Sequence, residues 1–209
     1  MKELLVATRN KGKVREIADL LAPCGIAVTS LLDCGPMPEI IEDGQTFRAN
    51  AVKKAVIIAQ HTGKLVMGED SGLEVDALGG RPGIYSARYA GEEADDEKNN
   101  MKLLRELEGV PFNKRTARYC SAMALADRNH CVDVVEGFCE GVIAVEPRGT
   151  NGFGYDPLFY ILSYQKTFGE LPLEAKQSMS HRAEALRKFL KLLERYLAER
   201  TPGLFKNFQ

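Results

Sequence analysis

Short apolar runs alternate with stretches of helical periodicity along this chain, and this alternation constrains its fold most strongly. Leu4 to Ala7 form an apolar run that ends in a polar loop at residues 8–13. Apolar residues then recur at helical spacing from Val14 to Leu21. This order predicts a strand, a tight loop and a helix, as expected in an α/β protein.

A second helix-and-strand region follows between residues 42 and 75. Apolar residues recurring between Val52 and Ala59 predict a helix, and Thr46 stands where it can cap that helix. Residues 65–67 and 73–75 predict two short strands, because the polar sequence at 68–72 is typical of a turn. The sequence therefore places its adjacent acids, Glu69 and Asp70, at a break between strands.

The second half of the chain carries an antiparallel signal. Residues 116–126 and 132–145 predict two half-buried strands joined by a turn, the second strand bent at Gly137. Helices are expected around residues 95–107 and 183–197, and Ser180 could cap the latter. Residues 1–200 are therefore predicted to form one α/β domain around a mixed sheet, with two lobes about a central cleft. Residues 201–209 are predicted to be a tail.

Composition excludes several classes of protein. Hydrophobic residues make up 44% of the 209 residues and charged residues 27%, which excludes a disordered or collagen-like chain. The 28 Lys and Arg residues are balanced by 29 Asp and Glu, so we expect neither a nucleic acid nor a membrane partner. Five cysteines without a C-x-x-C spacing, and no apolar run near the ~18 residues of a membrane span, predict a cytoplasmic protein.

The loop at residues 8–13 has the properties of an anion site. A strand leads into a helix there, and the first N–H groups of a helix are unpaired and lie at the positive end of its dipole. Lys13 adds a mobile cation, and Gly12 lets the backbone come close to a ligand. Together with the hydrogen-bonding groups of Thr8 and Asn10, these features suit a chain of phosphates. The alternative is an Asn-capped helix with a solvated lysine.

Acidic residues gather in the two polar segments that follow. Repulsion between adjacent carboxylates such as Glu69 and Asp70 is relieved when they hold a divalent cation. Near a phosphate ester, one carboxylate can help to hold Mg²⁺ while another orients or deprotonates the attacking water. Glu42 precedes the helix that carries Asn50 and Lys54 one turn apart. The alternatives are a solvent-exposed turn for the acid pair and a solvated helix face for Asn50 and Lys54.

A last polar cluster joins residues 152–157 to Lys176 and to residues 180–182. Phe153 is flanked by glycines and can stack on a planar ring, and Asp156 can accept hydrogen bonds from ring N–H groups. An Arg in the first turn of a helix is poorly placed unless an anion or a carbonyl faces it. The cluster therefore suits a nucleobase that carries a keto oxygen. The alternative is a core aromatic with a surface His-Arg pair.

Taken together, these clusters describe one ligand, a purine nucleoside triphosphate with Mg²⁺. The chain closely resembles the inosine triphosphate pyrophosphatase family, the XTP/dITP diphosphatases, from Leu4 to about Leu197. The resemblance lies in the segments ATRNKGK (7–13), EDGQTFRANAVKKA (42–55), EDSGLEVDALGGRPGIYSARYAG (69–91), GFGYDP (152–157) and SHRAEAL (180–186). It implies an elongated α/β homodimer that hydrolyses ITP, dITP or XTP to the monophosphate and pyrophosphate.

The resemblance also implies a role for individual residues. Asp70 would be the catalytic acid-base residue and, with Glu42, would bind Mg²⁺. The phosphate end of the substrate would be bound by Thr8, Arg9, Asn10, Lys11, Gly12, Lys13, Lys54 and Ser71. The base would be bound by Phe153, Gly154, Tyr155, Asp156, Lys176, His181 and Arg182. Donors that face the 6-position favour a carbonyl, because the amino group of adenine would leave them buried and unpaired.

Two other functions were weighed against this one. The related septum-inhibitor group of nucleotide pyrophosphatases acts on modified pyrimidine triphosphates, but the GFGYDP and SHR segments argue against it. A module that senses nucleotides or contacts RNA without turnover gains nothing from paired acids unless it uses a metal. The sequence therefore favours in-line attack of water on the α-phosphorus, with Asp70 as general base and lysines neutralising the departing pyrophosphate.

Overall fold

The structure is a computed structural model that describes residues 2–93 and 95–200. The tail predicted at residues 201–209 lies outside the described residues. The strands are β1 (Lys2–Val6), β2 (Ile26–Ser30), β3 (Val66–Val75), β4 (Thr116–Ala126), β5 (Cys131–Ile143), β6 (Phe159–Ile161) and β7 (Lys166–Thr167). Within the described residues they form one sheet of seven strands, in the order β2-β1-β3-β4-β5-β6-β7. This mixed sheet confirms the α/β class predicted from the sequence.

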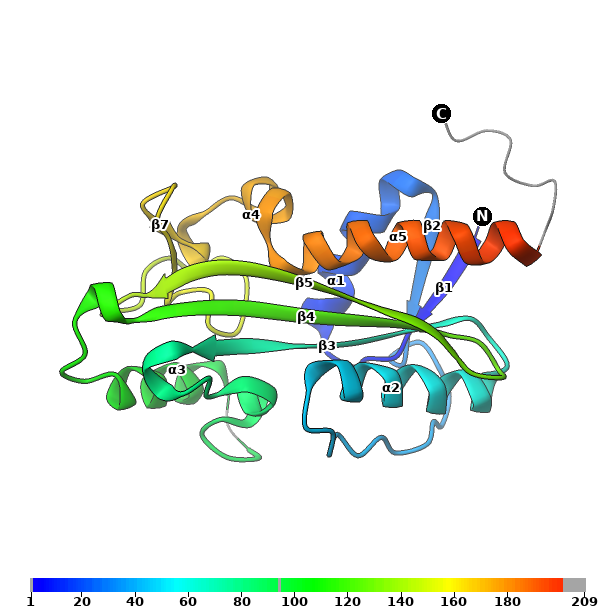
Figure 1. The fold of residues 1–209 in the computed structure, drawn as a ribbon, viewed down its shortest axis with the longest axis horizontal. Helices are drawn as coiled ribbons and strands as arrows, with labels where there is room; N and C mark the ends of the chain where they lie inside the picture. Colours follow the sequence, from blue (N-terminus) through cyan, green and yellow to red (C-terminus); the bar gives the residue numbers. More distant parts are fainter. Residues whose placement is uncertain (1, 94, 201–209) are drawn as a thin grey trace.

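The sheet combines a parallel edge with a long antiparallel centre. β1 lies between β2 and β3 and is parallel to both, whereas the other neighbouring pairs are antiparallel. β3, β4 and β5 run along the longest axis of the molecule (Figure 1). The predicted hairpin is confirmed as β4 and β5, and Asp127 closes its turn by accepting hydrogen bonds from the N–H groups of Asn129 and His130.

The predicted break at residues 68–72 is wrong, because β3 is one continuous strand. Every residue from Val66 to Val75 is paired with β4, and Asp70 stands opposite Ala122. Gly, Ser and Asp favour turns locally, but here the pairing along β4 satisfies the backbone and overrides that preference. Successive side chains of a strand point to opposite faces, so Glu69 and Asp70 lie on opposite sides of the sheet.

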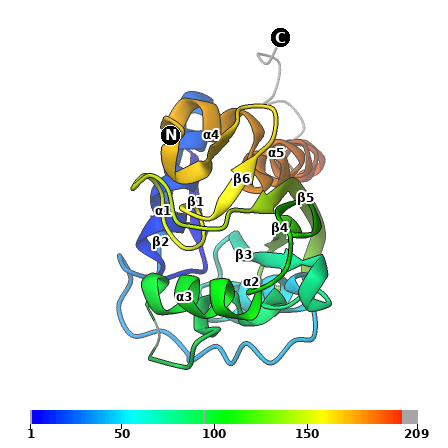
Figure 2. The same ribbon diagram turned by 90° about the vertical axis from the view of Figure 1, so that its left-hand side faces the viewer.

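Helices cover both faces of the sheet (Figures 1 and 2). They are α1 (Lys11–Leu21), α2 (Phe47–Thr62), α3 (Asp96–Glu106), α4 (Leu173–Met179) and α5 (His181–Arg200), with short 3-10 helices at Ala22–Cys24, Asp76–Leu78, Gly83–Arg88, Phe112–Lys114 and Phe168–Glu170. α1 and α5 pack in one apolar cluster, and α2 packs in another on the opposite face. Among the helices described, none combines the length and apolarity needed to cross a membrane.

Three of the helices begin at side chains that the sequence marked as caps. Asn10, Thr46 and Ser180 each accept a hydrogen bond from the backbone N–H three residues later, at 3.0, 3.1 and 3.2 Å respectively. Such caps satisfy N–H groups that the first turn of a helix leaves unpaired. They therefore fix where α1, α2 and α5 start, and each start lies beside one of the predicted functional segments.

Two glycines allow the helices to approach the sheet closely. A Cβ on Gly68 would overlap the backbone of α2, and a Cβ on Gly137 would overlap the backbone of α5. The missing side chains let the backbones of these helices lie directly against the strands. As a result, Asn50 and Lys54 of α2 reach β3 from one face, and the start of α5 reaches it from the other.

Four elements were missed by the sequence analysis, namely β2, β6, β7 and α4. β6 and β7 have three and two residues, which is too short for a periodic signal. α4 has seven residues and begins directly after Pro172. This short helix matters because it carries Lys176 into the interior of the molecule.

Candidate active site

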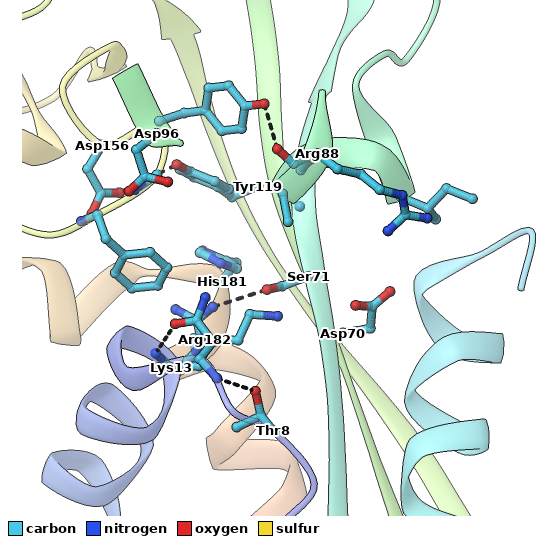
Figure 3. A pocket seen from close by; sticks show the side chains of 18 of the residues that line it. Thr8, Lys13, Asp70, Ser71, Arg88, Asp96, Tyr119, Asp156, His181 and Arg182 are labelled. Atoms are coloured by element: carbon cyan, nitrogen blue, oxygen red, sulfur yellow. Dashed lines mark hydrogen bonds between the residues drawn. The ribbon is translucent and has the colours of Figure 1, made fainter. Parts of the chain in front are cut away.

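A cavity of about 320 Å³ lies between the carboxyl end of β1 and the loop at residues 152–156. It is drawn in Figure 3. It is lined by fifteen of the predicted site residues: Thr8, Arg9, Asn10, Lys13, Glu42, Lys54, Asp70, Ser71, Phe153, Gly154, Tyr155, Asp156, Lys176, His181 and Arg182. Lys11 is exposed and does not line the cavity, and Gly12 lines a second, neighbouring cavity instead.

The loop after β1 forms one end of the cavity. Thr8 Oγ1 accepts a hydrogen bond from the Asn10 N–H at 3.1 Å, and Asn10 Oδ1 accepts one from the Lys13 N–H at 3.0 Å. These bonds hold the loop in a tight turn at the start of α1. The Lys13 ammonium lies 2.7 Å from Glu69 Oε2. The loop therefore presents a positively charged helix start and a lysine to the cavity.

The centre of the cavity holds Asp70, which points towards α2 (Figure 3). Lys54 Nζ donates to Asp70 Oδ1 at 2.9 Å and lies 2.7 Å from Glu42 Oε2, so one ammonium joins two carboxylates. Asn50 Nδ2 donates to Asp70 Oδ2 at 3.1 Å. Asn50 also accepts a hydrogen bond from the Gly44 N–H at 2.8 Å, which ties down the loop that carries Glu42.

Burial sets the protonation behaviour of this group. Asp70 is 5% exposed and Lys54 is 6% exposed, so the alternative of a solvated helix face is wrong. Burial raises the pKa of the Asp70 carboxyl above its usual value, although the charge of Lys54 opposes the change. Burial acts to lower the pKa of Lys54, but Asp70 and Glu42 outweigh it and raise that pKa.

Glu69 faces the other side of the sheet and has its own partners. Its Oε1 accepts hydrogen bonds from Ser121 Oγ at 3.1 Å and from the Arg182 guanidinium at 3.3 Å. Burial acts to raise the pKa of Glu69, but Lys13 and Arg182 outweigh it and hold that pKa far below its usual value. The two adjacent acids are thus neutralised separately, which removes the argument that they need one shared cation.

The far end of the cavity is built from buried charges. Lys176 Nζ lies 2.6 Å from Glu16 Oε1 and 2.5 Å from Asp156 Oδ2, and Glu16 also pairs with Arg182. Arg182 Nη2 donates to Ser71 Oγ at 3.1 Å. The predicted base-contacting cations are therefore held in fixed positions by acids of the protein. Burial raises the pKa of Asp156, against the opposing charge of Lys176.

His181 is a buried polar group at the cavity whose bonding the protein leaves incomplete. The residue is 3% exposed, and its ring stacks on the Tyr119 ring with centroids 4.6 Å apart. Its Nδ1 has no hydrogen-bond partner among the residues that the structure describes. Burial, with the nearby charges of Arg182 and Lys176, lowers the pKa of His181 well below its usual value. A neutral imidazole with an unpartnered nitrogen therefore lies in the wall of the cavity.

The glycine-rich loop at residues 152–156 is fastened from the opposite side of the cavity. Gly154 N–H donates to Asp96 Oδ2 at 2.6 Å, and Asn100 Nδ2 donates to the Gly154 carbonyl at 3.0 Å. Tyr155 OH donates to the Ser86 carbonyl at 2.8 Å. The structure thus connects this loop to α3 and to the segment Gly83–Arg88.

The sequence analysis missed several residues that line the cavity, including Tyr119, Arg88 and Asp96, and it missed Glu16, which pairs with Lys176 beside the cavity. Glu16 lies three residues after Lys13 on α1 and could have been found by helical spacing. The other three lie within predicted segments, but the local patterns gave them no role in the site. Tyr119 comes from the middle of β4, and Arg88 and Asp96 come from the connection after β3.

The predicted Mg²⁺ site can be compared with the carboxylates at the centre of the cavity. No group of three or more His, Cys, Asp or Glu side chains within residues 2–93 and 95–200 could hold a metal ion. Glu42 and Asp70 do lie on either side of one cationic group, the Lys54 ammonium. Two carboxylates fit Mg²⁺, because that ion usually takes one or two carboxylates and completes its shell with phosphate oxygens and water.

Comparison with solved structures defines the class of protein to which this fold belongs. The Ham1 protein of Staphylococcus aureus has a TM-score of 0.82 and 37% identity, and the match covers 93% of this chain and 100% of that chain. The nucleoside-triphosphatase / dITP/XTP pyrophosphatase of Mycobacterium abscessus has a TM-score of 0.73 and 41% identity, covering 91% and 99%. These structures share the fold of this chain.

The chain belongs to the Ham1 family, whose model matches residues 4–192. A relative from Desulforamulus reducens named dITP/XTP pyrophosphatase is 54% identical over 92% of this chain and 96% of its own length. A relative of the same name from Bacillus subtilis is 50% identical over 93% of this chain and 98% of its own. These matches confirm the family resemblance predicted from the sequence.

Proposed function

We propose that this protein hydrolyses nonstandard purine nucleoside triphosphates, ITP, dITP and XTP, to the monophosphate and pyrophosphate. Relatives named dITP/XTP pyrophosphatase align over nearly the whole chain, which supports this activity. The observation that carries the proposal is one cavity that joins a phosphate-type loop, a carboxylate with a raised pKa and a buried end with a free imidazole nitrogen.

The triphosphate binds at the loop after β1 in this proposal. The start of α1 and the Lys13 ammonium supply positive charge, and Thr8 and Asn10 shape the loop. Lys54 approaches from α2 on the other side of β3. Lysines at both sides neutralise the charge that develops on the departing pyrophosphate.

Asp70 is the general base that activates the attacking water. Its raised pKa makes it a better proton acceptor than an ordinary aspartate, and the Lys54 ammonium lies beside it. Glu42 and Asp70 would hold Mg²⁺, which when bound polarises phosphate oxygens and screens their charge. Asn50 fixes the Asp70 carboxylate by donating to the oxygen that Lys54 leaves free.

The base end selects a 6-oxo purine. Arg182 and Lys176 are fixed by Glu16, so they present N–H groups in set directions, and His181 adds a nitrogen without a partner. A 6-amino group would bring donors against donors and leave buried groups unpaired. Phe153 lines the same cavity and offers a ring face for stacking.

The setting of this activity is also proposed. The described cysteines form no disulfide, which agrees with a reducing cytoplasm. A homodimer, which the family resemblance implies, remains a prediction that size-exclusion chromatography with light scattering can check.

A substrate panel tests the proposed function. With Mg²⁺, we expect pyrophosphate and the monophosphate from ITP, dITP and XTP, with kcat/KM at least about 100-fold above that for ATP, since a buried unpaired group costs about 1–3 kcal/mol and more than one donor is affected. The products are separated by ion-exchange chromatography. Equal rates on all purine triphosphates would refute the proposed base selection, and release of orthophosphate alone would refute cleavage at the α-phosphorus.

A further inference from the structure

The ring of Phe153 lies between two cavities. It lines the main cavity and also a second one of about 340 Å³, which is formed by α1, the loop at residues 151–153 and α4. The second cavity has apolar walls that include Phe168, Leu171 and Pro172. The ring therefore borders two cavities, and a neighbouring residue must determine how it lies between them.

Gly12, in the first turn of α1, is the neighbour that determines the position of the Phe153 ring. A Cβ built on Gly12 would lie 2.8 Å from Cδ1, 2.9 Å from Cε1 and 3.0 Å from Cγ of Phe153. Real Cβ atoms essentially never approach other heavy atoms more closely than 3.0 Å. The Phe153 ring thus rests against the bare Cα of Gly12, in space that any other residue would fill.

The backbone at residue 12 does not itself require glycine. Gly12 is absent from the residues with positive φ and lies inside α1, where alanine is more favourable than glycine. The cost of a side chain at this position therefore falls on the Phe153 ring and not on the helix. In this respect Gly12 differs from the glycines of the described chain that adopt a positive φ.

Other contacts fix the rest of Phe153. Its backbone N–H donates to Asp156 Oδ2 at 2.9 Å. Lys176 Nζ lies 5.2 Å and Arg182 Cζ 5.6 Å from the centre of its ring, close enough for cation–π attraction. The backbone is held in place, so a side chain at residue 12 would turn the ring away from these cations and into one of the two cavities.

We propose that Gly12 is a positioning residue for base recognition, because its missing side chain seats the Phe153 ring where it can stack on the purine. This inference rests on the proposed function and deepens it. It links the first turn of α1, beside the proposed phosphate loop, to the base end of the same site. It also differs from the expectation that Gly12 lets the backbone approach phosphate.

The test compares Gly12→Ala with Gly35→Ala, a glycine without positive φ and with no atom within 4 Å of the Cβ position. Because stacking of a base on an aromatic ring contributes to binding, we expect Gly12→Ala to raise the KM for ITP about 10-fold with a smaller change in kcat. The inhibition constant of inorganic tripolyphosphate, which has no base, should stay within about 2-fold of the parent value. Gly35→Ala should change none of these constants.

A double-mutant cycle with Phe153→Leu identifies the partner. Leucine removes the ring that the new methyl group meets, so Gly12→Ala should have no further effect on the KM for ITP in the Phe153→Leu background. Additive effects, or a Gly12→Ala variant that weakens tripolyphosphate as much as ITP, would overturn the inference. Failure of the unmodified enzyme to turn over ITP would instead overturn the proposed function, so the two failures are distinguishable.

Discussion

The two faces of β3 give adjacent carboxylates opposite electrostatic environments. Glu69 meets Lys13, Arg182 and the Ser121 hydroxyl, and these partners hold its pKa far below the usual value. Asp70 shares one ammonium, that of Lys54, with a second acid, and burial raises its pKa. The comparison teaches that the acid with fewer positive partners is the one left able to take a proton. The better-paired acid serves to hold cations in position.

The largest effect is expected on the Asp70 face. Asp70→Asn keeps the shape of the side chain but removes the proton acceptor, so we expect kcat for ITP to fall about 1,000-fold, or about 4 kcal/mol on the barrier. Nucleotide binding, measured by calorimetry, should persist. The melting temperature should hold or rise, because burial disfavours the charged form of Asp70. A variant with near-normal turnover would contradict the assigned role.

Glu69→Gln tests the opposite face with the same chemical change. Two buried cations, Lys13 and Arg182, would lose a charged partner, so we expect the free energy of unfolding to fall by about 3 kcal/mol. Urea denaturation followed by circular dichroism measures the loss. If Asp70→Asn proved the more destabilising of the two, the contrast between the faces would not hold.

A smaller effect is expected at Glu16, which pairs with Lys176 and Arg182 at the base end. Those cations outweigh burial and lower its pKa, so its contribution to stability is present above its unfolded pKa of about 4.3 and is lost as pH falls through the folded value. We expect Glu16→Gln to cost about 2 kcal/mol at pH 7 and less below pH 4. Urea midpoints of both proteins at pH 7 and pH 3.5 check this, and a constant difference would contradict it.

Local signals in the sequence were sufficient to predict the strand, the loop and the helix at residues 4–21. An apolar strand, a polar turn and a helix cap lie within a few residues of one another, and the structure has the strand, the turn and the Asn10 cap that this pattern predicts. The β4–β5 hairpin was also predicted, because its alternation and turn are local. These features depend on neighbours in the chain.

The sequence analysis was wrong where distant segments decide the outcome. Turn propensity predicted a break at residues 68–72, but pairing with β4 keeps β3 continuous. Lys54 was given a solvated helix face as an alternative, yet it is buried against Asp70. Helical spacing could have placed Glu16 beside Lys13, but it carries no information about its partner Lys176, which lies 160 residues further along the chain.

The continuity of β3 has a consequence for how the two sides of the cavity are held relative to each other. A strand paired along its whole length cannot stretch, and each residue advances it by about 3.3 Å. Asp70 and Ser71, the residue that meets Arg182, are neighbours on this strand, and their side chains therefore lie on its two faces at a fixed separation. The Asp70 side and the Arg182 side of the cavity therefore keep a constant relation to each other, because Asp70 and Ser71 cannot move apart along β3.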